Sequence, residues 1–247
     1  MNKWFFFLTI IFSQVFCQSL SAQDYDSISL AKQKVFTSLE EAVKSPQLVY
    51  RLQLKNKRLK HIPAEVFTFT NLQELDLSKN GITEIPASIG ALTNLQILSL
   101  SKNKIAVFPV EICDLHKLSI LNVSGNKIDE LPPQIAFLKN LTFLDISANK
   151  ILLLTPSIGQ LTKLKSLILN RNNMRAIPPE IGELQNLIYL DIWGTLITGL
   201  PDEIGKLKNN LKVLDLRVDV ISNDKQSRIQ KLLPDTDINF SKGCNCP

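Results

Sequence analysis

The chain is poor in the residues that usually carry catalysis. Among its 247 residues it has only two histidines, His61 and His116, and both fall in segments that connect more regular apolar stretches. No paired nucleophile and base, no phosphate-binding loop and no cluster with metal-ligand spacing can be recognised. The sequence therefore predicts a non-enzymatic protein with no catalytic residue, no metal site and no cofactor. Both histidines are interpreted as solvated surface residues.

Long apolar runs are also missing, since the block from Trp4 to Phe12 is too short to span a bilayer. A short start with one positive charge precedes this block, and small residues follow it up to Ala22. This order is typical of a secretory signal peptide. It predicts cleavage after Ala22 and an exported protein that is secreted, periplasmic or held at the cell surface, with no transmembrane span in the mature chain. An uncleaved amino-terminal anchor is the main alternative, and lipoprotein processing at Cys17 is a weaker one.

The rest of the chain is dominated by a repeat. A phrase of the form L-x-x-L-x-L-x-x-N-x-I-x-x-I-P-x-x-I-G-x-L recurs every 23 residues from about Val49 to Leu207. Its leucines alternate with polar residues, which is the pattern of a short strand with one buried face. The proline and the apolar residues after it predict a short helical or extended return segment. One unit alone cannot bury enough apolar surface to offset the entropy lost on ordering its backbone, so the units must stack.

Two columns of the repeat are not filled by large apolar residues. Where the chain leaves each strand, backbone groups would be buried without partners, and asparagine offers both an acceptor and two donors to satisfy them. Lys57 and Thr195 replace asparagine in the end units, and Cys113 occupies a small-residue slot where a buried thiol is expected. The predicted structural ladder consists of Asn80, Asn103, Asn126, Asn149 and Asn172.

Both ends of the array are expected to be capped. A capping box at Ser38 predicts a short helix over about residues 37–45. After the array, the pattern predicts a helix over Asn223–Leu233 and a short strand at Asp237–Phe240. The thiols of the Cys244-Asn245-Cys246 tail could form a local disulfide, a poor metal site or an intermolecular link, and their redox state stays open. The predicted organisation is a signal peptide at 1–22, an amino-terminal linker and capping helix at 23–47, a repeat array of about eight strands at 48–221, a carboxy-terminal cap at 222–241 and a flexible tail at 242–247.

Residues 48–221 resemble the leucine-rich-repeat superfamily, in the 23-residue Leu-Pro-x-x-Ile-Gly-x-Leu variety of bacterial exported proteins and of intracellular scaffolds that bind small GTPases. The resemblance implies an α/β fold in the form of a curved, horseshoe-like leucine-rich-repeat solenoid. A concave parallel β-sheet, short convex helical turns and helical caps at both ends belong to that fold. A macromolecular partner is expected on the concave face, but the resemblance does not identify it, because the shared residues build the frame.

Candidate binding residues lie between the leucines of each strand, where side chains point away from the core. Adjacent strands lie roughly 4.8 Å apart, so these positions align into columns and predict an apolar and aromatic strip beside an acidic one. Trp193, where the asparagine column breaks, is the predicted hot spot. The alternative is that these residues only stabilise the strands through cross-strand pairing. The predicted partner-binding residues are Ile97, Ile120, Phe143, Ile168, Tyr189, Trp193, Asp76, Asp145, Asp191 and Asp215.

The leading functional prediction is an exported, monomeric module that binds a protein partner. Glycan or cell-wall recognition is a second class, in which the Asp76, Asp145 and Asp191 carboxylates accept hydrogen bonds from sugar hydroxyls while Tyr189 and Trp193 stack on the rings. An intracellular signalling scaffold is a third, if the first segment is not a signal. No nucleic acid is expected. The basic residues that follow the asparagine ladder are interpreted as a solvated edge, with docking to phospholipid or acidic polysaccharide as the alternative.

Overall fold

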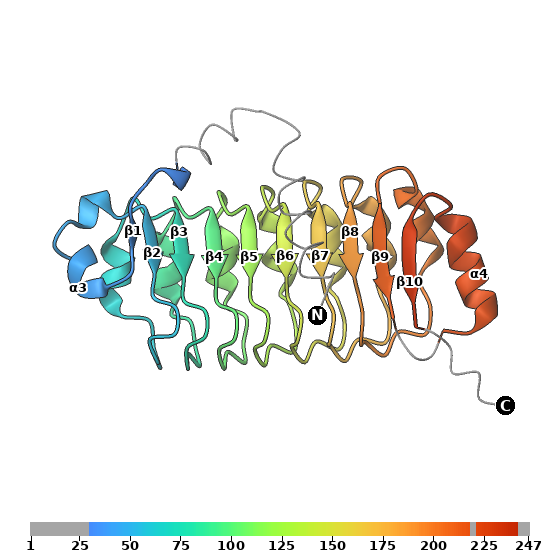
Figure 1. Cartoon of the computed structure of the whole chain (residues 1–247), viewed down its shortest axis with the longest axis horizontal. Coiled ribbons are helices and arrows are strands. Elements are labelled where there is room, and N and C mark those ends of the chain that lie inside the picture. Colours follow the sequence, from blue (N-terminus) through green and yellow to red (C-terminus); the bar gives the residue numbers. More distant parts are fainter. Residues whose placement is uncertain (1–29, 218–220, 242–247) are drawn as a thin grey trace, which may run out of the picture.

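The computed structural model describes residues 30–217 and 221–241, and within these ranges the chain forms one open solenoid (Figure 1). Ten short strands make a single parallel sheet in which the spatial order follows the sequence order. The predicted solenoid with one parallel sheet is confirmed. The strands are β1 (Val35–Phe36), β2 (Arg51–Gln53), β3 (Glu74–Asp76), β4 (Ile97–Ser99), β5 (Ile120–Asn122), β6 (Phe143–Asp145), β7 (Ser166–Ile168), β8 (Tyr189–Asp191), β9 (Val213–Leu216) and β10 (Asp237–Phe240).

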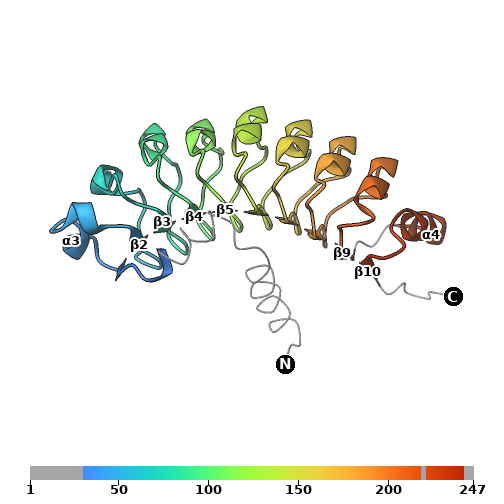
Figure 2. The same ribbon diagram turned by 90° about the horizontal axis from the view of Figure 1, so that it is seen from above.

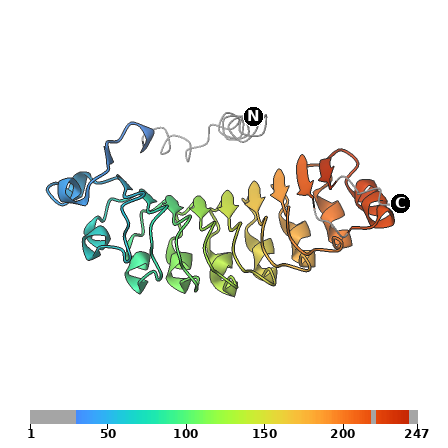
Figure 3. The ribbon, with the colours of Figure 1, turned by 60° about the horizontal axis from the view of Figure 1, so that its bottom comes forward.

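The return segments are 3-10 helices that stand in a row behind the sheet (Figure 3). Most begin directly after a proline in the extended conformation, as expected of a residue that fixes φ ahead of a helical turn. Thr155 replaces that proline in one repeat, and its side-chain oxygen accepts a hydrogen bond from the Ser157 N–H instead. The 3-10 helices are η1 (Pro46–Leu48), η2 (Ala64–Thr68), η3 (Ala87–Ala91), η4 (Val110–Asp114), η5 (Pro133–Phe137), η6 (Pro156–Gln160), η7 (Pro179–Glu183) and η8 (Asp202–Leu207).

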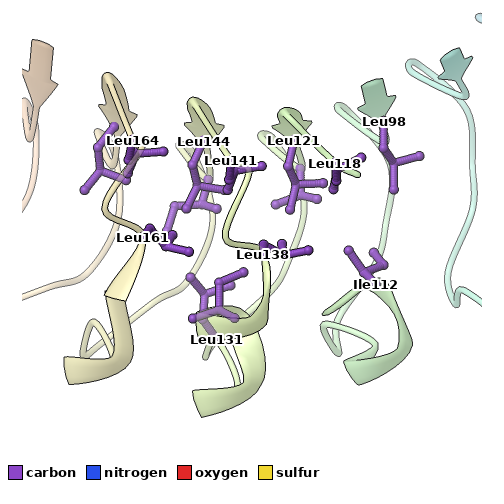
Figure 4. Close-up of a cluster of buried hydrophobic side chains, with 14 of the residues drawn as sticks. Leu98, Ile112, Leu118, Leu121, Leu131, Leu138, Leu141, Leu144, Leu161 and Leu164 are labelled. Carbon is purple, nitrogen blue, oxygen red and sulfur yellow. The ribbon is translucent and has the colours of Figure 1, made fainter. Parts of the chain in front are cut away.

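The core is a stack of aliphatic layers between the sheet and the 3-10 helices. Leu98, Leu121 and Leu144 point inward from successive strands, and Ile112 meets them from η4 (Figure 4). All four are fully buried. Cys113, next to Ile112, is a buried free thiol, and burial raises its pKa to about 12, with the charges of Asp114 and Glu111 adding to the shift. The prediction for the small-residue slot is confirmed at this position.

The asparagines hold neighbouring turns together. The side-chain nitrogen of Asn126 donates to the Val123 carbonyl of its own turn and to the Leu100 carbonyl of the preceding repeat, at 2.9 and 3.0 Å. Its oxygen accepts the Ile105 N–H at 3.1 Å. These are the backbone groups that the end of a strand would otherwise leave buried and unsatisfied. The same pattern recurs at Asn80, Asn103, Asn149 and Asn172.

Each turn also passes through the left-handed region of the backbone just before the ladder position, which holds asparagine in most repeats and Thr195 in one. Gly125 and Gly194 adopt φ values of 66° and 64° there, at no steric cost. Lysine, alanine or arginine occupies the same position in most other repeats, so these turns carry a small strain that the stack must offset.

The sheet lines the inner face of an arc and the 3-10 helices lie on its outer face (Figure 2). Curvature follows because helices with their side chains need more room than the spacing of adjacent strands. The predicted concave sheet and convex helical turns are therefore confirmed. No helix within 30–217 and 221–241 is long and apolar enough to cross a membrane.

The caps differ in detail from the predictions. Helix α3 (Leu39–Ala42) follows Ser38, but the Ser38 side chain makes no capping hydrogen bond. The predicted linker contains a strand, β1, which pairs with β2 through only two residues and is too short to show an alternating pattern. Helix α4 (Asn223–Leu232) and strand β10 close the other end as the sequence predicts. The predicted signal peptide and the Cys244 and Cys246 tail lie outside the described residues.

Candidate functional site

The strands align the candidate residues in the predicted columns. The register pairs Ile97 with Ile120 and Ile120 with Phe143, so these three side chains follow one another on the concave face. Ser166 follows Phe143 and separates it from Tyr189. The apolar strip is therefore continuous only over β4, β5 and β6.

These apolar side chains are half-buried, because the neighbouring strands lie close enough to shield their sides. Ile97, Ile120, Phe143, Tyr189 and Trp193 all have intermediate exposure. Ile168 differs, since only 8% of it is exposed. It lies in the column of the aspartates, at the third position of each strand, between Asp145 on one side and Asp191 on the other. Ile168 therefore offers little surface to a partner, contrary to its predicted place in an exposed strip.

The aspartates at the third position of the strands stabilise the turns that follow. The Oδ1 atoms of Asp76, Asp145 and Asp191 each accept the backbone N–H two residues further on, at 2.8 to 3.0 Å. Asn122 makes the same turn with Ser124. Side chains of this type stabilise a turn through such bonds, so half of each carboxylate is already engaged by its own strand. This role was not predicted, although the recurrence of Asp or Asn two residues before the turn could have indicated it.

Asp191 and Asp215 lie side by side at the carboxy-terminal end of this column. They are 8% and 2% exposed, so they are not the open acidic surface that the sequence predicted. The second oxygen of Asp191 accepts from the Asn170 amide at 2.6 Å, and the Arg217 guanidinium donates to both oxygens of Asp215. Burial raises the pKa of Asp191 to about 6, the charge of Asp215 adds to the rise, and hydrogen bonds from Trp193 and Asn170 oppose it.

Trp193 stands between two arginines. The Arg171 guanidinium lies 4.5 Å from the centre of the indole ring and that of Arg217 lies 5.3 Å from it. Arg171 belongs to the preceding repeat and Arg217 to the following one, so the ring is held from both sides along the solenoid. A guanidinium over the face of an indole makes a cation–π interaction with the ring, and two such contacts restrict the motion of the Trp193 side chain. The break in the asparagine column indicated Trp193, but no sequence pattern indicated these two partners.

Tyr189 completes this end of the face. Its pKa is raised by burial first, and then by the charges of Asp191 and Asp215. A hydrogen bond to Asp191 adds to the rise, so the phenol stays neutral throughout the physiological range. Tyr189, Asp191, Trp193, Arg171 and Arg217 form a compact group that we term the tryptophan cluster.

At the amino-terminal end of the concave face, the polar side chains of β2 and β3 bind one another. Arg51 donates to Glu74 at 2.6 Å, and Gln53 donates to the other oxygen of Glu74 at 2.8 Å. The Glu74 side chain is 11% exposed. This group fastens β2 to β3, so the first two repeats offer a satisfied polar surface, whereas the apolar strip and the tryptophan cluster offer aromatic and aliphatic surface.

A second asparagine ladder lies on the opposite edge of the solenoid and was not predicted. Each member donates its amide to a carbonyl of the preceding repeat, as Asn94 does to Thr70 at 2.9 Å. Lys117 and Lys163 take this position in other repeats, and each donates to the asparagine of the preceding repeat. The donors are Asn71, Asn94, Asn140, Asn186 and Asn210. Both His61 and His116 are exposed.

Comparison with known families agrees with this geometry. A model described as "Leucine-rich repeat region" matches residues 89–167, and one described as "Leucine rich repeat" matches residues 47–105. Residues 47–167 therefore match leucine-rich-repeat families. No curated protein matches it by sequence.

Several solved structures share the fold. A leucine-rich-repeat protein of Leptospira interrogans is 22% identical with a TM-score of 0.50, over 84% of this chain and 100% of that one. An internalin from Listeria monocytogenes is 22% identical with a TM-score of 0.71, over 80% and 56%. The ectodomain of the Arabidopsis thaliana receptor kinase GASSHO1/SCHENGEN3, solved in complex with CASPARIAN STRIP INTEGRITY FACTOR 2, is 29% identical with a TM-score of 0.67, over 78% and 24%. The chain thus spans about a quarter of that receptor ectodomain and little more than half of the internalin.

Proposed function

We propose that the protein is an exported, non-enzymatic binding module that holds a protein partner on its concave face. The tryptophan cluster is the observation that carries this proposal. Trp193 is only half-buried, yet two arginines hold its ring in place, so binding would cost little additional side-chain entropy. Rigid tryptophan, tyrosine and arginine side chains are the residue types that dominate binding energy in protein interfaces.

The apolar strip supports the same function. Ile97, Ile120 and Phe143 present a half-buried aliphatic and aromatic surface on three adjacent strands. A partner that covers both groups would lie across β4 to β8, with apolar contacts at one end and hydrogen bonds to the cluster at the other. Leucine-rich repeats are commonly protein-binding modules, and the plant ectodomain among the similar structures was solved with a bound factor.

Glycan recognition has less support on this face. The two Asp191 oxygens are engaged by Trp193 and Asn170, and the ring of Trp193 is flanked by Arg171 and Arg217. A sugar would therefore have to displace an arginine before it could stack on the indole. Binding to a glycan panel with an affinity matching that for protein partners would reverse this preference.

Affinity capture with the exported form tests the proposal, using a Phe143→Ala, Tyr189→Ala and Trp193→Ala triple variant. A Val110→Ala and Phe137→Ala variant is the matched control, because both residues are exposed and lie on the convex helices. A protein captured by the wild type and the control, but not by the triple variant, supports the concave face. Equal capture by all three would reject it. Mass spectrometry of the mature amino terminus distinguishes an exported module, which begins after Ala22, from an intracellular scaffold that keeps Met1.

A further inference from the structure

The loops that follow the strands form one edge of the solenoid with an unusual composition. Because all strands are parallel and in register, the segments from each strand to the next 3-10 helix lie along the same edge. We term these segments the loop edge, and Figure 1 shows the row of turns that the successive repeats form there. They are residues 54–63, 77–86, 100–109, 123–132, 146–155, 169–178 and 192–201.

The loop edge is strongly basic, and its basic side chains have no partner in the described part of the chain, apart from Arg171, whose guanidinium stacks on Trp193. Against eleven lysines and arginines it has three acidic residues, Glu84, Asp129 and Glu130. All eleven are exposed, and none makes a side-chain hydrogen bond or ion pair with the described part of the chain. They are Lys55, Lys57, Arg58, Lys60, Lys79, Lys102, Lys104, Lys127, Lys150, Arg171 and Arg175.

The opposite edge is also basic, but its lysines are engaged. The segments from each 3-10 helix to the next strand hold six lysines, and four of them donate hydrogen bonds within the protein. Lys117, for example, donates to Asn94 at 2.8 Å and Lys163 to Asn140 at 2.7 Å. These ammonium groups stabilise the second asparagine ladder. Charge alone therefore does not distinguish the two edges, whereas the availability of that charge does.

Large aliphatic side chains project from the same loop edge. Val107, Leu152, Leu153 and Leu196 are 76%, 58%, 70% and 52% exposed. Leu152 and Leu153 lie between the buried Ile151 and Leu154, at positions where other repeats have residues such as Asp129 and Glu130. The segments of the opposite edge, which run from each 3-10 helix from η2 to η8 to the next strand, expose no large hydrophobic side chain. Only the loop edge combines unpaired cations with projecting aliphatic groups.

We propose that the protein docks edge-on to an anionic lipid membrane through the loop edge. The lysines and arginines contact headgroup phosphates, and the four aliphatic side chains insert between the headgroups. Basic clusters next to apolar side chains are the combination that binds proteins to the surface of anionic bilayers. A hydrated linear polyanion would account for the charges but would gain nothing from the exposed leucines. In this orientation the strands stand upright on the membrane and the concave face stays open, so the inference extends the proposed function without depending on it.

Co-sedimentation of the full chain with vesicles tests the proposal. Vesicles of phosphatidylcholine mixed with phosphatidylglycerol should bind the protein, and binding should weaken as salt screens the charges. Pure phosphatidylcholine vesicles measure any binding through the apolar amino-terminal segment, which requires no anionic lipid. A Lys104→Gln, Lys127→Gln and Lys150→Gln variant should bind the anionic vesicles about 100-fold more weakly, at roughly fivefold for each charge near the surface.

A Lys117→Gln, Lys139→Gln and Lys163→Gln variant is the matched control, because it removes the same charge from the opposite edge. It should bind within about threefold of the wild type, since charges on the far edge lie beyond the screening distance. Equal losses in both variants would show attraction by net charge alone and would overturn the proposal. Thermal unfolding of each variant verifies that these surface substitutions leave the fold intact.

The aliphatic side chains separate a membrane from other polyanions. A Leu152→Ser and Leu153→Ser variant should bind anionic vesicles roughly tenfold more weakly at any salt concentration, while Val110→Ser and Phe137→Ser on the convex face should have no effect. Unchanged vesicle binding by the leucine variant, or tighter binding to a soluble acidic polysaccharide than to vesicles, would refute membrane docking. The Phe143, Tyr189 and Trp193 triple alanine variant should retain vesicle binding, so failure of the concave face to bind a partner would leave this result unchanged.

Discussion

The guanidinium of Arg171 lies 4.5 Å from the ring centre of Trp193, one repeat further along the solenoid. Arg171 has a left-handed backbone with φ of 55°, and a Cβ added to Gly194, which follows the tryptophan, would lie 3.6 Å from the Arg171 side chain. The turn that builds the repeat thus also orients a side chain of the candidate site. Frame and site are coupled at this position, whereas the apolar strip depends only on the strands.

Truncation of Trp193 should produce the largest loss of partner binding. Trp193→Ala is expected to weaken binding by about 2 kcal/mol or more, because it removes an aromatic anchor and leaves two arginines without their stacking partner. Arg171→Ala should cost less, about 1 kcal/mol, through loss of the ring's orientation. Isothermal titration calorimetry with a captured partner measures both. A Trp193→Ala effect below about 0.5 kcal/mol would remove the tryptophan cluster from the interface.

Asn126 should stabilise the fold more than an asparagine of the exposed ladder. Asn126→Ala removes four hydrogen bonds, one of them long at 3.4 Å, and leaves the buried Ile105 N–H without a partner, so a loss of about 3 kcal/mol in the free energy of unfolding is expected. Asn140→Ala removes two exposed bonds, one donated to the His116 carbonyl and one accepted from Lys163, and should cost about 1 kcal/mol or less. Urea denaturation compares the two variants. Similar losses for both would contradict the assignment of the buried column as the main tie between repeats.

The glycines of the 3-10 helices should respond differently to a methyl group. A Cβ at Gly182 would lie 2.4 Å from the Glu203 carbonyl oxygen, whereas at Gly90 the nearest atom, the Glu111 carbonyl oxygen, is 3.4 Å away. Gly182→Ala is therefore expected to destabilise the protein by about 1 to 3 kcal/mol through overpacking against backbone. Gly90→Ala should change stability by less than about 0.5 kcal/mol. Thermal unfolding tests this order, and a larger effect at Gly90 would contradict it.

Asp191 should give the protein a pH-dependent stability of a particular sign. Its pKa is raised to about 6 in the folded state, so the folded protein binds this proton more tightly than the unfolded chain, where the ordinary value is about 3.8. Its contribution to stability is therefore greatest below pH 4 and is lost as pH rises through 6, by at most about 3 kcal/mol. Asp191→Asn should remove that part of the pH dependence. The difference between wild type and variant in urea unfolding at pH 5 and pH 7 measures it, and no difference would argue against the raised pKa.

The repeat columns allowed the stacking of the chain to be predicted because each has a single physical role. Leu98 and Leu121 could only be core residues. Asn126 could only serve to satisfy the backbone groups that are buried where the chain leaves a strand. The accessibility of the candidate site could not be predicted in this way. Ile168 and Tyr189 both occupy positions that alternate with leucines, yet one is buried and the other half-exposed, because exposure depends on the side chains of the neighbouring strands.

The sequence by itself determined the period, the parallel sheet, the buried asparagine ladder and the curvature, because a 23-residue unit repeated without interruption leaves one way to bury its leucines. It also indicated Trp193, where the asparagine column breaks. Only the tertiary structure decided that Asp191 and Asp215 are buried turn residues, that Arg171 and Arg217 hold Trp193 from either side, and that unpaired lysines and exposed leucines share one edge. These relationships join residues of different repeats, and stacking sets their distances, which no local pattern contains.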